Sequence, residues 1–502
     1  MKPYTKYMIL LVLCLCLLAL SACGGGNGPS GETDPSTGGE GVSETAGGGE
    51  GPEPTDPHAY YKEHFGDMDM KGKEVWIYDL NTSPDLHINF YDDYNGDPLN
   101  VELYLRELLF EELYGVRFEY FSSTAGSKVI SNSVLNDLYV ADIIYGRASG
   151  DRLMTLAQNG CLSNLRSFSA LDFSQPWWGN FISDSLTVND RLFFTSGDIL
   201  PSFYQSIGCF FYNINQGSRY GISKDSLCSS VEEGDWTWEL LHTLSADAYE
   251  NLDANEELTA DVDRFGFLSY NVYNHTNMFA IGAGLKLCEE TADGTWIVDL
   301  ESPAVVETLG RLLTQMDHYS MGANGVDSIM DTTFKSGRAV FAEHFTESAF
   351  ATLRDMEDDY LMLPVPKLDA AQDGYRCMVN SYVNCFVGVL SNCSDQAVVG
   401  AVLESMAYAG YHDIRPVAYE EVLKGQLARD PLATTMVDLI FDTAYIDYGV
   451  IEKFGVTTEY PQGVSSILYG YLKEGKGLTS EFQQMKNTIN SDLAKALEAF
   501  TK

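Results

Sequence analysis

The chain has 502 residues, and its 31 lysines and arginines stand against 72 aspartates and glutamates, which gives a formal net charge of −41. This charge excludes nucleic acid as a partner, because a polyanion gains by releasing counterions only to a basic surface. Hydrophobic residues make up 45% of the chain, enough for a large buried core, and the length predicts two or three lobes at about 150 residues each.

The N-terminus has the pattern of an export signal. Lys2 and Lys6 supply positive charge, and an apolar run follows at residues 8–20. The run is too short for a transmembrane helix, which needs about 20 apolar residues. It ends in Leu-Ser-Ala-Cys at residues 20–23, which resembles the lipobox of bacterial lipoproteins. We therefore expect residues 1–22 to be a lipoprotein signal peptide, Cys23 to carry the lipid, and the protein to sit on the extracellular face of the cytoplasmic membrane.

Residues 23–57 differ in composition from the rest of the chain. After Cys23 they are rich in glycine, proline and acidic residues, and they contain no aromatic or basic residue. Such a segment cannot offset its ordering entropy by burial. We expect a disordered tether between the lipid and a folded body.

The cysteines are predicted to be free. Ten occur, of which two lie in the expected signal peptide and Cys23 is expected to be acylated. The other seven cannot all pair, none forms a Cys-x-x-Cys, and most lie among apolar residues, so small buried hydrophobes are favoured over disulfides or a metal site. These seven are Cys161, Cys209, Cys228, Cys288, Cys377, Cys385 and Cys393.

From residue 71 onward, β-rich runs alternate with helical periodicity. Strands are expected at residues 75–78, 116–121 and 141–145. Helices are expected at 99–114 and 127–138, and a third helix after the last strand is expected to end at residue 159. This βαβαβ order predicts a parallel sheet that binds ligands beyond the carboxyl ends of its strands. The candidate binding loops are residues 79–83, 122–126 and 146–150. Further helices are expected at 236–245, 303–316, 395–408, 430–443 and 480–500.

Six motifs occur in a particular order over roughly residues 72 to 430. They are Ala-Asp-Ile-Ile-Tyr (141–145), Leu-Ala-Gln-Asn-Gly-Cys-Leu (156–162), Gly-Cys-Phe-Phe-Tyr-Asn (208–213), Trp-Thr-Trp-Glu-Leu (236–240), Phe-Lys-Ser-Gly-Arg-Ala-Val (334–340) and Leu-Pro-Val-Pro-Lys (363–367). Each is common by itself, but the series behind a lipobox resembles the extracellular solute-binding proteins of ABC importers, in their maltose-type, carbohydrate-binding branch. The last 60 residues match least well.

The resemblance implies an α/β fold of the periplasmic-binding-protein type II kind, with two lobes, each a mostly parallel sheet flanked by helices, and a ligand cleft between them. Lobe I would comprise residues 58–202 and 378–425, and lobe II residues 203–377 and 426–502. The implied function is a monomeric, lipid-anchored binding protein that captures a sugar or oligosaccharide and delivers it to the permease subunits of an ABC importer.

We expect no catalysis, because the chain has no Gly-x-Ser-x-Gly, His-Glu-x-x-His or Gly-x-Gly-x-x-Gly motif. Two alternatives stay open. A surface glycoside hydrolase needs only two carboxylates, and acidic residues are too abundant here for any pair to be informative. A ligand-sensing subunit for a membrane receptor kinase would have the same fold.

Sugar sites need planar polar groups for hydroxyls and aromatic rings for C–H faces. Asp79 and Asn81 follow the first strand and Arg147 the third, in loops where the resembling family places polar sugar contacts. The mixed charges of these three residues predict a neutral ligand. The full set of expected ligand-binding residues is Asp79, Asn81, Arg147, Trp178, Tyr273, His275, His344 and Tyr382.

One acidic loop, residues 251–263, has oxygen side chains at spacings similar to those of an EF-hand calcium loop. It is degenerate, because Glu256 stands where the sharp turn needs glycine. A solvated loop is the favoured interpretation, so we expect no cofactor, with calcium as the alternative. The calcium candidates are Asp253, Asn255, Glu257 and Asp261.

Overall fold

The computed structural model describes residues 58–80, 97–122, 126–148, 153–179, 181–253, 258–259, 262–270, 272–316, 329–422 and 430–501. The chain divides into two units, residues 1–59 and 60–502, and the fold below is that of the second. The predicted signal peptide, the predicted lipidation site Cys23 and the whole of the predicted tether lie outside the described residues.

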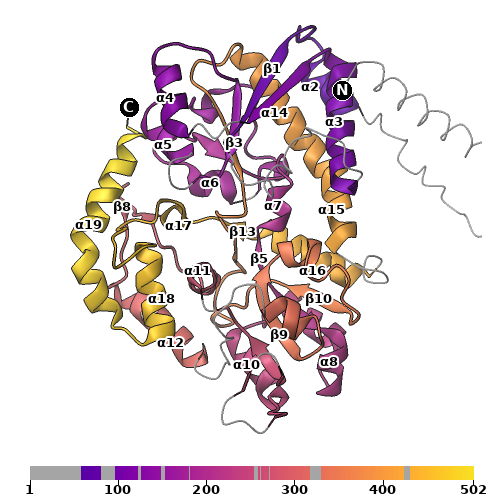
Figure 1. The fold of residues 1–502 in the computed structure, drawn as a ribbon, viewed down its shortest axis with the longest axis vertical. Coiled ribbons are helices and arrows are strands. Elements are labelled where there is room, and N and C mark those ends of the chain that lie inside the picture. The colour runs from indigo at the N-terminus through magenta and orange to yellow at the C-terminus, as the bar shows by residue number, and fades with distance from the viewer. Residues whose placement is uncertain are drawn as a thin grey trace, which may run out of the picture. The chain divides into compact units, whose positions relative to one another are not determined.

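The first sheet has five strands in the order β2-β1-β3-β12-β4 (Figure 1). These strands are β1 (Glu74–Asp79), β2 (Arg117–Ser122), β3 (Ile143–Gly146), β4 (Phe194–Thr195) and β12 (Phe386–Val389). The βαβαβ prediction is confirmed, because α3 (Pro98–Tyr114) joins β1 to β2, α4 (Ser127–Leu135) joins β2 to β3, and β1 pairs parallel with both. Asp97 caps α3 by accepting the Leu99 N–H, and Gly115 ends it in the left-handed conformation that glycine favours.

The second sheet has four strands in the order β10-β5-β9-β6. They are β5 (Gly208–Asn213), β6 (Phe265–Leu268), β9 (Ala339–Phe345) and β10 (Tyr360–Leu363), and every residue in them is buried. Phe210 of β5 stacks on Phe267 of β6 with ring centroids 5.3 Å apart, and Trp238 meets Phe210 edge-on at 5.8 Å. This aromatic packing fills the core between the sheet and its covering helix.

Both sheets are mostly parallel in strand direction, as the resemblance implied, but each contains one strand that runs the opposite way. In the first sheet β12 runs antiparallel to its neighbours β3 and β4, and in the second sheet β5 runs antiparallel to its neighbours β9 and β10, while β6 and β9 pair in parallel. The physical reason is connectivity. β5 and β12 each enter a sheet after the chain has crossed from the other one, so neither belongs to a βαβ unit that would fix a parallel direction.

The remaining elements surround these sheets. The short strands are β7 (Glu289–Glu290), β8 (Trp296–Ile297), β11 (Cys377–Met378) and β13 (Ala444–Tyr445). The helices are α2 (Ala59–Phe65), α5 (Leu153–Gln158), α6 (Ile182–Leu186), α7 (Ser202–Gln205), α8 (Ile214–Arg219), α9 (Lys224–Glu232), α10 (Trp238–Ser245), α11 (Tyr273–Gly282), α12 (Pro303–Met316), α13 (Glu347–Phe350), α14 (Gln396–Ala409), α15 (Arg415–Val422), α16 (Pro431–Asp442), α17 (Tyr448–Glu452), α18 (Val464–Glu474) and α19 (Leu478–Glu498). The five later helices expected from the sequence correspond to α10, α12, α14, α16 and α19.

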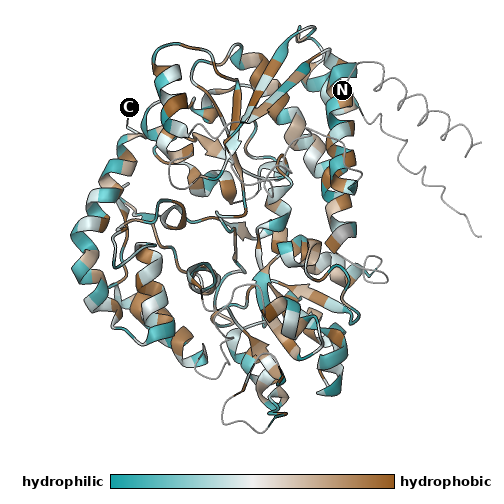
Figure 2. Ribbon diagram, in the orientation of Figure 1, coloured by the Kyte–Doolittle hydropathy of each residue, from teal (hydrophilic) through white to brown (hydrophobic). Residues whose placement is uncertain are grey.

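The C-terminal helices pack near α11. α18 lies against both α11 and α19, and Asn277 of α11 donates to Ser465 of α18 at 2.9 Å. Hydrophobic and hydrophilic bands alternate along α19 in Figure 2, and its buried residues recur every three or four positions, as in an amphipathic helix. Within the described part of the chain, no helix is long and apolar enough to cross a membrane.

The cysteine prediction is confirmed. All seven cysteines from Cys161 to Cys393 are described and free, and all but Cys393 are buried. Burial raises the pKa of six thiols, that of Cys377 to about 11, which keeps them protonated and unreactive at neutral pH; the six are Cys161, Cys209, Cys228, Cys288, Cys377 and Cys393.

Candidate functional site

The first polar group of the site comes from neighbouring strands of the first sheet. Asp79 ends β1 and pairs in register with Tyr145 of β3, and Arg147 follows β3 directly. Because β1 and β3 are parallel, their carboxyl ends meet at one edge. The Asp79 carboxyl is almost buried, at 4% exposure, whereas Arg147 is partly exposed. Two of the three polar contacts predicted for this lobe therefore share an edge, and Asn81 lies outside the described residues.

Tyr382 lies in the segment that crosses from β11 back to β12. The Arg147 guanidinium carbon is 6.0 Å from the centroid of the Tyr382 ring. Asn380 accepts hydrogen bonds from the Tyr382 N–H at 3.0 Å and from the side chain of Asn274, at the start of α11, at 3.1 Å. The crossing segment thus brings the first sheet's loop and the start of α11 to one place.

The C-terminal segment adds two residues that sequence reasoning missed. The Lys453 ammonium lies 4.1 Å from the centroid of the Tyr382 ring and donates to its hydroxyl. The Tyr382 hydroxyl in turn donates to Gln462 at 3.2 Å. Nothing local in the sequence marks Lys453 or Gln462, because their proximity to Tyr382 depends on how α17 and α18 pack.

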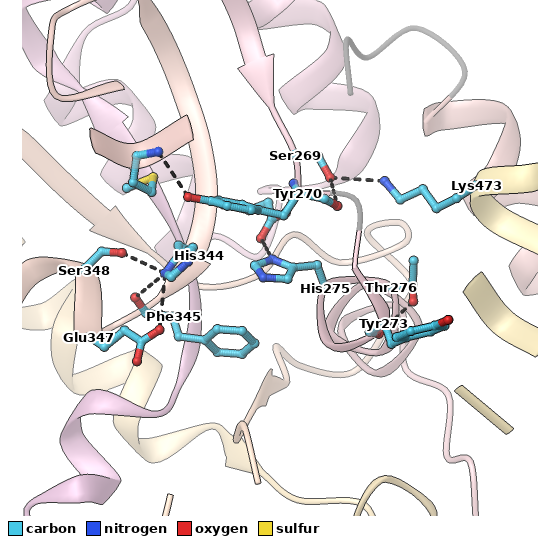
Figure 3. Close-up of polar contacts among 12 residues, drawn as sticks. Ser269, Tyr270, Tyr273, His275, Thr276, His344, Phe345, Glu347, Ser348 and Lys473 are labelled. Atoms are coloured by element: carbon cyan, nitrogen blue, oxygen red, sulfur yellow. Dashed lines mark hydrogen bonds and ion pairs between the residues drawn. The ribbon is translucent and has the colours of Figure 1, made fainter. Parts of the chain in front are cut away.

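Two of the second lobe's predicted residues, His275 and His344, lie near a buried carboxylate. Glu343 of β9 is fully buried, with its Oε2 2.5 Å from His275 Nδ1 and its Oε1 accepting the Tyr270 N–H at 2.7 Å. Tyr270 follows β6, which is parallel to β9, so the carboxylate ties the ends of two parallel strands to the first turn of α11. Figure 3 shows His275 beneath Tyr270, whereas the Tyr273 ring points away from His275. Tyr273 packs instead on Tyr469, with ring centroids 4.8 Å apart.

His344 borders this cluster as a neutral group. Its Nδ1 is 2.7 Å from the Ser348 hydroxyl, and its ring centroid is 5.4 Å from that of His275. Burial, with the neighbouring His275, lowers the pKa of His344 to about 3. His344 is therefore uncharged at neutral pH and can offer a hydrogen bond without an ionic charge.

Lys473 of α18 reaches the same cluster from the C-terminal side (Figure 3). Its ammonium donates to the Ser269 hydroxyl at 3.2 Å. Burial lowers the pKa of Lys473 to about 8, and the Glu343 carboxylate opposes that decrease. Glu343 thus both orients α11 and partly balances a half-buried cation.

Trp178 lies in the interior instead of at an accessible surface. It is 1% exposed, and its indole N–H donates to Glu404 of α14 at 2.9 Å. A ring in that position has almost no surface to present to a sugar. The sequence could not show this, because a Pro-Trp-Trp run has the same pattern on a surface as in a core.

The acidic loop is held by its own backbone contacts. Asp263 accepts the N–H groups of Leu252 and Thr259, both at 2.6 Å. Of the calcium candidates, Asp253 is described, and the other three lie outside the described residues. Within the described ranges, no group of three or more His, Cys, Asp or Glu side chains could hold a metal ion.

The carboxyl of Glu452, next to Lys453, should make the stability of the protein depend on pH. Burial, with the nearby Asp492, raises the pKa of Glu452 from 4.5 to about 7. The folded protein therefore holds this proton more tightly than the unfolded chain, so stability should fall as pH rises from about 4.5 to about 7. Glu452→Gln mimics the protonated form. Between pH 5 and pH 8, the free energy of unfolding should therefore fall by about 2 kcal/mol less in Glu452→Gln than in the parent protein. Chemical denaturation at the two pH values measures the difference. The exposed Glu459→Gln is the control, and equal pH profiles for both variants would contradict the assignment.

Comparison with known proteins places the fold. No family model matches the chain, and no curated protein matches it. Among solved structures, the sugar-binding protein MalE from Xanthomonas citri is 14% identical, covers 86% of this chain and 100% of its own, and has a TM-score of 0.55. The cyclic alpha-maltosyl-1,6-maltose binding protein from Arthrobacter globiformis is also 14% identical, covers 84% and 98%, and has a TM-score of 0.53. At this identity the likeness establishes the fold.

Proposed function

Because the chain has the two-lobed α/β fold of the maltose-type solute-binding proteins, we propose that it captures a sugar or oligosaccharide outside the cell. In this proposal the protein is anchored by a lipid on Cys23, binds its ligand without chemical change and delivers it to the permease subunits of an ABC importer. Residues 1–57, which would carry the anchor, lie outside the described part of the chain.

The observation that carries the proposal is the convergence of polar and aromatic side chains where the crossing segment passes between the sheets. Arg147 and Lys453 each lie against the Tyr382 ring, and Asn274 joins Tyr382 to α11 through Asn380. Planar amides, a guanidinium and an aromatic ring are the groups that bind hydroxyls and C–H faces of sugars. The strand-end position is also where α/β folds bind ligands.

Arg147→Ala should weaken saccharide binding by about 1 to 3 kcal/mol, about ten- to more than hundredfold in affinity, because it removes a forked donor from a partly exposed position. Titration calorimetry measures the loss. The matched control is Arg117→Ala, because Arg117 is exposed and pairs with Glu74 at the far edge strand. Unchanged affinity in Arg147→Ala would remove Arg147 from the site.

Cys23→Ala should abolish the lipid anchor, because the cysteine thiol is the only group in the lipobox that can carry the acyl chain. Labelled palmitate should enter the parent protein and a Cys393→Ala control, but not the Cys23→Ala variant, whose signal peptide should stay attached. A parent protein that is fully soluble and has an unmodified N-terminus would contradict the anchor.

A further inference from the structure

One buried side chain joins the Tyr382 ring to another part of the site. Asn380 lies two residues before Tyr382 in the crossing segment and is 6% exposed. Its Oδ1 accepts the Tyr382 backbone N–H at 3.0 Å and the Asn274 side chain at 3.1 Å. Because a backbone N–H can only donate, the Asn380 atom that faces it is the oxygen, and the Asn274 group that faces the same oxygen is its NH2 group. A single carbonyl oxygen, with two lone pairs, therefore connects two segments of the chain.

The backbone of Asn380 is itself fixed by its neighbours. Its N–H donates to the Ser206 carbonyl at 2.7 Å, in the segment that leads into β5. Its own carbonyl accepts the N–H groups of Val383 at 3.1 Å and Asn384 at 2.8 Å. The side-chain oxygen of Asn380 thus starts from a fixed point, so the groups that it holds are placed relative to both segments that cross between the sheets.

The Asn274 end of this connection is tied to the second sheet. Asn274 lies in the first turn of α11, and the next residue, His275, contacts Glu343 of β9 with its Nδ1 2.5 Å from Oε2. Consecutive residues of a helix point about 100° apart, at 3.6 residues per turn. One turn of α11 therefore holds the second sheet through His275 and Asn380 through Asn274, and a displacement of this turn would move the donor that faces Asn380.

The Tyr382 end presents a ring at the proposed ligand position. The Tyr382 side chain is partly exposed, whereas Asn380 is buried. The Lys453 ammonium lies 4.1 Å from the ring centroid, and the Tyr382 hydroxyl donates to Gln462 at 3.2 Å. These two contacts hold the outer end of the side chain, and the bond to Asn380 holds the backbone from which the side chain starts.

We propose that Asn380 is a positioning residue of the saccharide site, which sets the place of the Tyr382 ring and makes that place depend on the first turn of α11. This role rests on the proposed function, because it takes Tyr382 as a ligand contact. A structural role alone would change stability. A positioning role changes affinity as well, and does so only while the Tyr382 ring is present.

Asn380→Leu, which keeps a similar volume and removes the acceptor, should weaken saccharide binding by about tenfold. Asn380→Asp keeps a side-chain oxygen in the same place and should bind within about threefold of the parent protein. Titration calorimetry on the purified protein measures both, with maltotriose, lactose, 3′-sialyllactose and digalacturonate as probes. The control is Asn136→Leu, because Asn136 is an exposed asparagine at the end of α4 and its replacement should leave the affinity unchanged.

A double-mutant cycle shows whether Asn380 acts through Tyr382. Once Tyr382→Ala has removed the ring, Asn380→Leu should lower the affinity further by less than about twofold. A full tenfold loss in the Tyr382→Ala background would give Asn380 another role and overturn the inference.

Asn274→Ala tests the dependence on α11 and keeps the outcome interpretable if Asn380→Leu folds poorly. Asn274 is partly exposed and lies outside the crossing segment, so its replacement should fold. It should weaken binding by about threefold in the parent protein and leave it unchanged in the Tyr382→Ala background. An equal loss in both backgrounds would show that Asn274 does not act through the ring.

Hydrogen exchange tests the same connection without a ligand. In Asn380→Leu the Tyr382 amide should exchange about tenfold faster, whereas the amides of Val383 and Asn384 should stay protected by the Asn380 carbonyl. Unchanged exchange at Tyr382 together with unchanged affinity would overturn the positioning role and leave the proposed function standing. Failure of the parent protein to bind any of the four saccharides would overturn the proposed function and, with it, this role of Asn380.

Discussion

Replacing Glu404 with leucine should lower the free energy of unfolding by about 3 to 5 kcal/mol. Its carboxylate accepts the indole N–H groups of Trp177 and Trp178, both at 2.9 Å, the backbone N–H of Asp172 at 3.1 Å and the Tyr60 hydroxyl at 3.3 Å. Each buried donor left without an acceptor costs about 1 to 3 kcal/mol. Although burial raises the pKa of Glu404, its role as a shared acceptor makes it stabilising.

Chemical denaturation of Glu404→Leu and Glu420→Leu measures this effect. Glu420 lies on the adjacent helix α15 and is exposed, so its replacement should change stability by less than about 0.5 kcal/mol. A loss below about 1 kcal/mol in Glu404→Leu would show that the four donors find other partners.

Glu343→Leu should be equally destabilising, by about 3 to 5 kcal/mol, and should also weaken saccharide binding. The substitution removes the acceptor of the Tyr270 N–H and the partner of His275, and it removes the carboxylate charge that stabilises the half-buried Lys473 ammonium. The first turn of α11 then loses the contact that fixes it to β9. Loss of both stability and affinity distinguishes this site from Glu404, whose replacement should affect stability alone.

A double-mutant cycle isolates the charge effect. Because Lys473 is costly once Glu343 is gone, Glu343→Leu with Lys473→Met should be more stable than Glu343→Leu alone. Denaturation of the four proteins gives the coupling energy. If the two substitutions simply add, the Glu343 and Lys473 charges do not interact and the account of this cluster is wrong.

Local patterns predicted much of the fold. The helix expected at 303–316 is α12 residue for residue, because proline at a first turn and a regular apolar period are properties of the segment itself. The strand-end position of Asp79 and Arg147 followed from βαβ connectivity in the same way. The antiparallel entry of β5 and β12 could not be predicted from local patterns, since it depends on the crossings between sheets.

The site was predicted in part for the same reason. Residues next to strand ends could be predicted from the sequence. Lys453 and Glu343 could not, because a lysine after a short helix and a glutamate inside an apolar strand each occur in many structural contexts. The burial of Trp178 depends on Glu404, 226 residues away. Contacts at such separations are set by tertiary packing, which no local period encodes.

The measurement that tests the central claim most directly is titration calorimetry of the purified protein with a panel of acidic and neutral oligosaccharides, followed by chromatography of the ligand. We predict saturable binding of at least one saccharide at one site per chain, loss of affinity in Arg147→Ala, and recovery of the ligand unchanged. Binding of no saccharide would contradict the proposed function, and cleavage of the ligand would identify a glycoside hydrolase instead.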